Sequence, residues 1–234
     1  MTRRTGRRPV IVVSGYTAAG KTTHARLLSK TLDVPLYSAS DLLRSVLKEL
    51  EGVSGEWGER WSPNIDAARL GNDVDKIVDH YMREAVRYCS GGVFDATYLP
   101  WIYSPDDVVN LWIDSDKPSR VRKCVVSHLG AANLSLAEAD AVVTAKDSFS
   151  RQMIRRRYGA RFHAEEGRFD IVVSNSDLIA RPTLECAAQG ITAFAPLVLD
   201  CILYILGEGD APDSPRAKRL VTRLPTSPAS GDFS

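Results

Sequence analysis

The residues best suited to chemistry lie at positions 15–23, where the chain reads G-Y-T-A-A-G-K-T-T. The pattern G-x-x-x-x-G-K-T is typical of the P-loop, a turn that binds phosphate through its main-chain amides. Lys21 can reach the β- and γ-phosphates of a bound nucleotide, and the Thr22 hydroxyl can ligate Mg²⁺. Glycines in the turn allow the backbone angles that point successive amides inward. The residues expected to bind the triphosphate are Gly15, Ala18, Ala19, Gly20, Lys21, Thr22 and Thr23.

The alternative interpretation is a chance glycine-rich turn, and the flanking residues argue against it. Residues 10–13, V-I-V-V, form a β-branched run that is typical of a buried parallel strand. Residues 23–30 carry apolar side chains at helical spacing. A strand, a glycine-rich turn and a helix are the context that the motif requires.

Acidic residues at strand ends form the second candidate group. Asp95 closes the expected strand 92–95. In P-loop proteins such an acid holds Mg²⁺ directly or through water, although it can also be a simple turn or capping aspartate. Asp114 ends the expected strand 108–114 and competes for the same role. We expect Thr22 and Asp95 to form the metal site.

Arginines form the third group. Arg44 follows Asp41 by one helical turn, and a guanidinium can grip a phosphate with two parallel hydrogen bonds. Arg151 and Arg155 are four residues apart and therefore project from one side of a helix. Mobile arginines can close over a transferring phosphoryl group while excluding water. The alternative for each is an ordinary solvated helix face. Four aromatic residues can stack on a base or pack in the core: Tyr16, Trp57, Trp61 and Trp101.

The composition indicates a soluble globular protein. The chain has 234 residues, 44% hydrophobic residues and a net charge of +1, so nothing attracts it globally to nucleic acid or to an anionic membrane. The four cysteines show no C-x-x-C pair, which favours reduced thiols and a cytoplasmic location. The most apolar stretch, 191–206, is interrupted by Pro196 and Asp200 and is shorter than the roughly 20 residues of a membrane span. We expect it to be a core-facing helix.

The order of the expected elements predicts an α/β fold. Strands within 32–38, 92–95, 108–114 and 169–174 follow the first strand and alternate with helices, the longest over 136–158. This alternation predicts a parallel sheet of about five strands with helices on both faces, as in the P-loop NTPase three-layer fold. We expect a flexible tail over 1–8, one domain over 9–206 and a disordered tail over 207–234.

With these residues in place, the chain resembles the nucleoside monophosphate kinases, and most closely the short, archaeal-type cytidylate kinases. The resemblance covers most of residues 9–180. It rests on V-I-V-V-S-G-Y-T-A-A-G-K-T-T, on S-A-S-D-L-L-R, on N-I-D followed by V-D-K-I-V-D, and on R-R-R-Y-G followed by R-F-D-I-V-V-S-N-S. It implies an acceptor-binding insertion over about 40–88 and an arginine lid over about 145–166.

The resemblance also implies roles for particular residues. Arg44 would bind the acceptor phosphate, and Arg151 and Arg155 would be lid arginines. Arg120 matches the first arginine of the family's V-R-x-x-R helix, with Lys123 in place of the second. Asn175 would lie near the donor adenine. The expected acceptor-binding residues are Asp41, Arg44, Asp66, Thr97 and Tyr98, and the expected catalytic residues are Lys21, Asp95, Arg151 and Arg155.

One segment departs from the family pattern. After the third strand the family usually has a glycine–arginine or serine–arginine pair that helps to hold the acceptor, whereas residues 94–101 read F-D-A-T-Y-L-P-W. Loss of one cationic partner would cost about 1–3 kcal/mol of acceptor binding. The acceptor is then an altered nucleotide or a different molecule, and Asp95 is able to accept a proton from an alcohol.

Three hypotheses follow. The leading one is transfer of a phosphoryl group from ATP, with Mg²⁺, to a pyrimidine nucleoside monophosphate such as CMP or dCMP. The second is phosphorylation of a hydroxyl group of a nucleoside, sugar or natural product, with Asp95 as the base. The third is a nucleotide-binding module without transfer activity. In the leading hypothesis the partner is a small-molecule acceptor, not nucleic acid or membrane, and the protein is a monomer or homodimer.

Overall fold

The computed structural model describes residues 8–51, 74–130, 133–165 and 167–218. Within these residues a single six-stranded sheet has the order β2-β3-β1-β4-β5-β6. The first five strands are parallel, and β6 pairs antiparallel with β5. The strands are β1 (Val10–Gly15), β2 (Leu36–Ser38), β3 (Gly92–Asp95), β4 (Val108–Asp114), β5 (Ile171–Ser174) and β6 (Ala217–Lys218).

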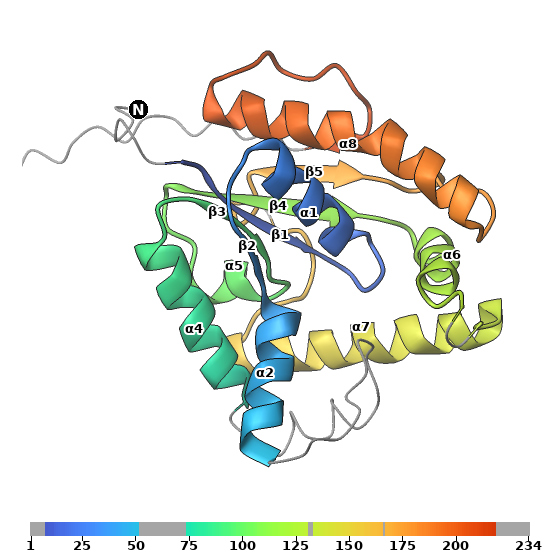
Figure 1. The fold of residues 1–234 in the computed structure, drawn as a ribbon, viewed down its shortest axis with the longest axis horizontal. Helices are drawn as coiled ribbons and strands as arrows, with labels where there is room; N and C mark the ends of the chain where they lie inside the picture. Colours follow the sequence, from blue (N-terminus) through green and yellow to red (C-terminus); the bar gives the residue numbers. More distant parts are fainter. Residues whose placement is uncertain (1–7, 52–73, 131–132, 166, 219–234) are drawn as a thin grey trace, which may run out of the picture.

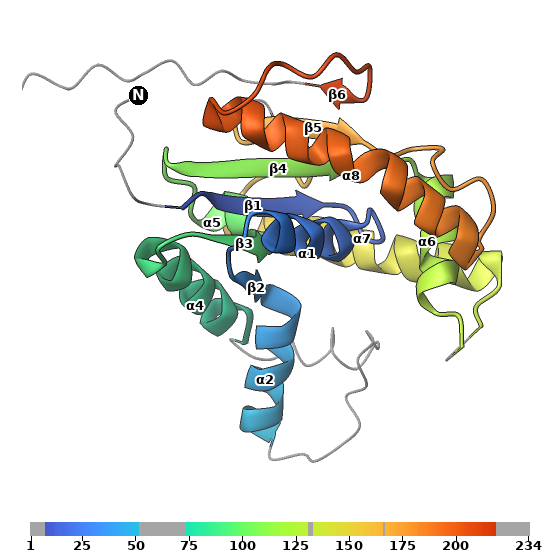
Figure 2. The same cartoon turned by 45° about the horizontal axis from the view of Figure 1, so that its top comes forward.

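Helices cover both faces of the sheet (Figures 1 and 2). They are α1 (Lys21–Thr31), α2 (Ala39–Glu51), α4 (Val74–Tyr88), α5 (Leu99–Ile102), α6 (Lys117–Ser127), α7 (Leu136–Tyr158) and α8 (Leu184–Leu206). This arrangement confirms the predicted α/β P-loop fold, with one short antiparallel edge strand added to the five expected parallel strands.

Side chains of β1 alternate between two hydrophobic clusters. Ile11 and Val13 pack with residues of α1 and α8, whereas Val10 and Val12 pack with residues of α2 and α4. All four side chains are at most 3% exposed. Because both faces of a parallel sheet are covered, its central strands are continuous apolar runs rather than alternating ones.

The central position of β1 creates the site. Strand β1 lies between β3 and β4, and the connection from β3 to β4 passes to the other side of β1, so the strand order reverses beside β1. Ligands of open α/β sheets bind at such a reversal, beyond the carboxyl ends of the strands. The register places Val13 opposite Asp95 and Gly15 opposite Ile113, so the P-loop, Asp95 and the end of β4 meet at one edge.

The long helix α7 passes beneath this edge (Figure 1). It begins with a capping box: the Ser135 hydroxyl accepts from the amide of Glu138, whose carboxylate in turn accepts from the amide of Ser135. It ends at Gly159, whose φ of 64° lies in the left-handed region. One apolar cluster joins it to α6, and its observed range is the one predicted.

Helix α8 is long and apolar enough, by length and composition alone, to cross a membrane. Its stripe of Phe194, Val198, Cys201 and Ile202 is buried against α1 and the sheet. The predicted core-facing side is confirmed, but the helix has 23 residues, so the expectation that this stretch is too short to span a membrane was wrong, and 28% of its most apolar 18-residue window is buried.

Of the remaining domain and segment boundaries predicted from the sequence, one is corrected by the structure and others stay untested. Residues 207–234 were expected to form a disordered tail, but 207–218 fold back so that Ala217 pairs with Val173, and the Arg216 guanidinium donates to the carbonyls of Ser174 and Ser176. Residues 219–234 lie outside the described residues. Trp57, Trp61 and Asp66 lie outside the described residues. The proposed limits of the insertion and the lid stay predictions.

Candidate functional site

The backbone of the P-loop takes the conformation that its glycines permit. Gly15 has a φ of 147°, and a Cβ at this position would lie 2.5 Å from the carbonyl oxygen of Ile113 on β4. Gly20, with a φ of 96°, is the N-cap of α1. Ala18 also has a positive φ, 58°, which costs a residue with a Cβ roughly 1–2 kcal/mol. The turn is thus held in a strained shape by close packing against the sheet.

Lys21 lies at the centre of this turn. Its Nζ donates a hydrogen bond to the carbonyl oxygen of Tyr16, 2.8 Å away, which folds the side chain back over the loop. Burial lowers the pKa of the ammonium group, and the nearby carboxylates of Asp95 and Asp147 oppose that shift. The charge is therefore partly desolvated and has few competing ligands, which suits it to bind phosphate oxygens.

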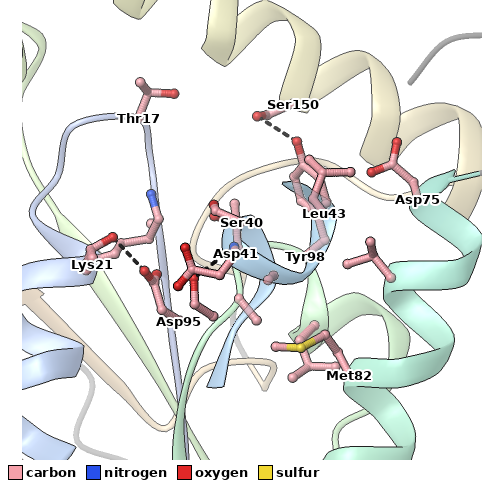
Figure 3. Close-up of a pocket in the computed structure, with 18 of the residues that line it drawn as sticks. Thr17, Lys21, Ser40, Asp41, Leu43, Asp75, Met82, Asp95, Tyr98 and Ser150 are labelled. Carbon is pink, nitrogen blue, oxygen red and sulfur yellow. Dashed lines mark hydrogen bonds between the residues drawn. The ribbon is translucent and has the colours of Figure 1, made fainter. Parts of the chain in front are cut away.

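Thr22 and Asp95 form a compact pair of oxygens, and Asp95 lies beside Lys21 (Figure 3). The Thr22 hydroxyl donates to Asp95 Oδ2 over 2.5 Å, and Asp95 is 7% exposed. Mg²⁺ in phosphate-transfer sites takes one or two protein oxygens and completes its shell with phosphate and water, so this pair fits that ion. The competing acid, Asp114, does not line the cavity that contains Asp95.

The cavity has a volume of about 420 Å³ and opens between the P-loop, α2, α4 and α7. Figure 3 shows Lys21, Asp95, Asp41 and Tyr98 arranged around it. Several predicted site residues from distant parts of the chain line it together: Gly15, Ala18, Lys21, Thr22, Asp41, Arg44, Asp95, Thr97 and Tyr98.

The acceptor side of the cavity is held by side-chain contacts. Arg44 pairs with Asp41, one turn earlier on α2. The Tyr98 hydroxyl is 3.0 Å from Ser150 Oγ on α7, so the segment after β3 is joined to the helix that carries the predicted lid arginines. On α4, Asp79 receives the Arg157 guanidinium at 2.9 Å and the Tyr158 hydroxyl at 2.5 Å.

Two cations of this cavity were not singled out from the sequence. Arg26 on α1 and Lys146 on α7 both line it. Arg26 is exposed and makes no ion pair with any residue that the structure describes. The signal for Arg26 was its spacing, because it is four residues after Thr22 and must share its helix face. Nothing local distinguishes Lys146 from other lysines of a polar helix.

Arg120 is buried in an ion pair. Its Nη1 donates to Asp147 Oδ2 at 2.6 Å, and the two side chains are 6% and 4% exposed. The other oxygen of Asp147 accepts the amide of Thr17 in the P-loop, 3.1 Å away. Asp147, which the sequence did not single out, therefore links α6, α7 and the P-loop. The predicted nucleotide contact of Arg120 stays a prediction.

The two predicted lid arginines are both exposed on α7. The Arg151 guanidinium carbon lies 5.9 Å from the centre of the Tyr16 ring. In this conformation neither Arg151 nor Arg155 lines the cavity. Their predicted closure over the phosphoryl group would require a movement of side chains or of the helix end.

A second cavity, of about 350 Å³ and mostly apolar walls, lies on the other side of the P-loop. Gly20, Thr23 and Asn175, all predicted nucleotide-binding residues, line it together with side chains of α6 and α8. The Asn175 amide donates to the carbonyl of Ala19 at 2.7 Å, and the Asn175 oxygen accepts from Lys123. The end of β5 is thus tied to the P-loop.

Two titratable groups of this second cavity are strongly desolvated. Burial lowers the pKa of Lys123 to about 7 and the pKa of His24 to about 4. His24 is 3% exposed and packs edge-to-face on Phe194, and its Nδ1 has no hydrogen-bond partner among the described residues. Both groups therefore favour their neutral forms more than exposed side chains do.

Comparison with known proteins agrees with this geometry. The cytidylate kinase of Pyrobaculum arsenaticum is 28% identical over 171 residues, which is 72% of this chain and 85% of that protein. The cytidylate kinase of Desulfurococcus amylolyticus is 28% identical over 169 residues, 72% of this chain and 84% of that protein. An uncharacterized protein from Eubacterium ventriosum has a similar fold, with a TM-score of 0.53 and 17% identity over 82% of this chain and 99% of that one.

The sequence pattern of one family spans the chain from the first strand to the turn after β5. Residues 10–177 match the cytidylate kinase-like family, and this range includes the P-loop, α7 and every residue that lines the first cavity, whereas the α8 side of the second cavity lies beyond it. The match extends over well more than half of the chain. The chain therefore belongs to the cytidylate kinase-like family and is a phosphotransferase.

Proposed function

We propose that this protein transfers the γ-phosphoryl group of ATP to the phosphate of a pyrimidine nucleoside monophosphate, with CMP or dCMP as the expected acceptors. The observation that carries the proposal is the gathering of cations around one cavity. The side chains of Lys21, Arg26, Arg44 and Lys146 line it from three helices, and the carboxylates of Asp41, Asp75, Asp79 and Asp95 line it as well. A site for two phosphorylated substrates must compensate several negative charges at close range.

The donor would lie across the P-loop. Its phosphates would bind the amides of the turn and Lys21, and its adenine would enter the second cavity beside Asn175, where the walls are mostly apolar. The Thr22 and Asp95 oxygens would hold Mg²⁺, which supplies charge neutralisation to the phosphates when it is bound. Asp95 already accepts a hydrogen bond from Thr22, which suits a metal-holding role.

The acceptor would lie between α2 and α4. Arg44 would bind its phosphate, and the proposal is supported by the lining of this cavity, to which α2 contributes Arg44 and α1 contributes Arg26. Arg26 would thereby provide the second cation that the segment after β3 lacks. An acceptor phosphate is already anionic, so its oxygen can attack in line without a general base, and Arg151 and Arg155 would close over the transferring group.

The direct test is an assay of ADP formation by the purified protein with ATP, Mg²⁺ and a panel of nucleoside monophosphates. We expect turnover to be fastest with CMP or dCMP. Lys21→Ala should abolish turnover, because the main counter-charge of the phosphates is lost. If no nucleoside monophosphate supports ADP formation, the proposal is wrong.

The role of Arg26 has a separate test. Arg26→Ala should raise the KM for the acceptor by about tenfold, the effect of losing one charged hydrogen bond, with the KM for ATP unchanged. Lys30→Ala is the matched control, because Lys30 is exposed near the end of the same helix and lies outside the cavity. Equal effects of the two substitutions would exclude a specific contact.

Phosphorylation of an alcohol remains the second candidate, since residues 96–101, directly after β3, contain no arginine and Asp95 ends that strand. Asp95→Asn separates the two reactions. A hydroxyl acceptor would lose almost all turnover with ATP affinity kept, because its general base is gone. A monophosphate acceptor would instead show a raised Mg²⁺ requirement that higher Mg²⁺ partly restores. We expect the second result, and a cytoplasmic location for the enzyme.

A further inference from the structure

Tyr16 is the second residue of the P-loop, and its ring is firmly held. It packs edge-to-face on Trp112, with centroids 5.1 Å apart, and on Phe162, with centroids 5.3 Å apart. Its hydroxyl donates to the carbonyl oxygen of Phe162 over 3.2 Å. An aromatic side chain fixed on three sides has little freedom left and presents its π-face in one orientation.

Two guanidinium groups lie against this ring. The Arg120 carbon is 5.0 Å from the ring centre, and the Arg151 carbon is 5.9 Å away. Arg120 is neutralised by Asp147, whereas Arg151 makes no ion pair with any described residue. Within the described part of the chain, the ring of Tyr16 is thus the contact that locates the Arg151 charge beside the P-loop.

The helix that carries Arg151 is itself aligned to the loop. Asp147 is one turn before Arg151 on α7 and accepts the amide of Thr17, the residue next to Tyr16. This hydrogen bond fixes the position of α7 relative to the P-loop. Because residues four apart lie on the same face of a helix, Arg151 faces the P-loop as Asp147 does. Two contacts therefore hold Arg151 near Tyr16: the hydrogen bond between Asp147 and the Thr17 amide, and the contact of the Arg151 guanidinium with the Tyr16 ring.

We propose that Tyr16 is a positioning residue, which holds the Arg151 guanidinium at the edge of the P-loop so that it closes on the transferring phosphoryl group. The inference rests on the proposed function, in which Arg151 is a lid arginine. A cation over an aromatic face is attracted by the ring quadrupole while it remains accessible to a stronger anion. Tyr16 would therefore keep Arg151 close without competing strongly with the nucleotide.

The test compares Tyr16→Phe with Tyr16→Met in the full-length protein, each in the wild-type and Arg151→Gln backgrounds. Tyr16→Phe keeps the aromatic face and should leave kcat within about twofold. Tyr16→Met fills similar apolar space without that face and should lower kcat by roughly three- to fivefold, with the KM for ATP unchanged. In the Arg151→Gln background the same substitution should have no further effect, because the residue through which Tyr16 acts is gone.

A role of Tyr16 in packing alone predicts the opposite pattern. Tyr16→Met would then lower kcat by the same factor in both backgrounds, which overturns this inference but leaves the transfer activity of the wild type, and so the proposed function, intact. Failure of the wild type on every nucleoside monophosphate rejects the proposed function instead. An unchanged kcat in Arg151→Gln removes the lid role and the inference with it.

A second series keeps the shape of the ring if Tyr16→Met does not fold. Phenylalanines with increasing fluorine content at position 16 withdraw π-density while they retain the aromatic packing on Trp112 and Phe162. We expect kcat to fall stepwise with fluorination in the wild-type background and to stay level with Arg151→Gln. A level response in both backgrounds would overturn the inference.

Discussion

The ion pair between Arg120 and Asp147 gives the sharpest prediction for stability. Both side chains are almost completely buried, at 6% and 4% exposure, and lie beneath the P-loop. Removing one member of a buried pair leaves the other charge uncompensated, at a cost of about 3–5 kcal/mol. Asp147→Ala also removes the acceptor of the Thr17 amide, which adds about 1 kcal/mol.

The expected loss for Asp147→Ala is therefore about 4–6 kcal/mol in the free energy of unfolding, and an apparent Tm about 8–24 °C lower. Urea titration followed by circular dichroism measures the first quantity, and a thermal scan measures the second. The control is Asp140→Ala on the same helix. Asp140 pairs with Lys117 at 2.9 Å, but those side chains are 49% and 45% exposed, so solvent screens the pair and its removal should change the stability far less than the removal of Asp147.

The double variant Arg120→Met/Asp147→Leu distinguishes a lost ion pair from general disruption. An apolar pair of similar volume is often as stable as the buried ion pair, so the double variant should be more stable than Asp147→Ala. A deficit of about 1 kcal/mol should remain, because the Thr17 amide stays without its acceptor. If Asp140→Ala costs as much as Asp147→Ala, or if the double variant recovers nothing, the reasoning from burial fails.

Three further predictions concern the P-loop and its surroundings. Gly15→Ala should destabilise the protein by about 2 kcal/mol or more and abolish nucleotide binding, measured by urea titration and calorimetry, because its Cβ would meet the Ile113 oxygen at 2.5 Å. Ala18→Gly should be tolerated and Ala18→Val should lose nucleotide affinity, since φ is 58° there. The free energy of unfolding should fall as the pH is lowered from 6.5 to 4. In this range the unfolded chain binds a proton at His24, whereas the folded protein, in which the pKa of His24 is about 4, does not. His24→Leu should lose that part of the pH dependence of stability.

Much of the fold was predictable because its signals are local. The β-branched run at 10–13 and the spacing G-x-x-x-x-G-K-T identify a strand, turn and helix without any distant contact. Asp95 was expected at a strand end, and the register of β1 with β3 places it beside Thr22, as that expectation required. Strand β6 was not predicted, since two residues carry no periodicity and its pairing depends on the neighbouring β5 edge.

What the sequence by itself determined was the class of the protein: a phosphate-binding turn between a buried strand and a helix within an alternating α/β chain. Only the tertiary structure decided which distant side chains serve that turn. Asp147 contacts Thr17 across 130 residues, and Arg26 meets Arg44 at one cavity. Local backbone preferences set the strands and helices, but contacts between them depend on how whole helices pack, and no short pattern of residues specifies that packing.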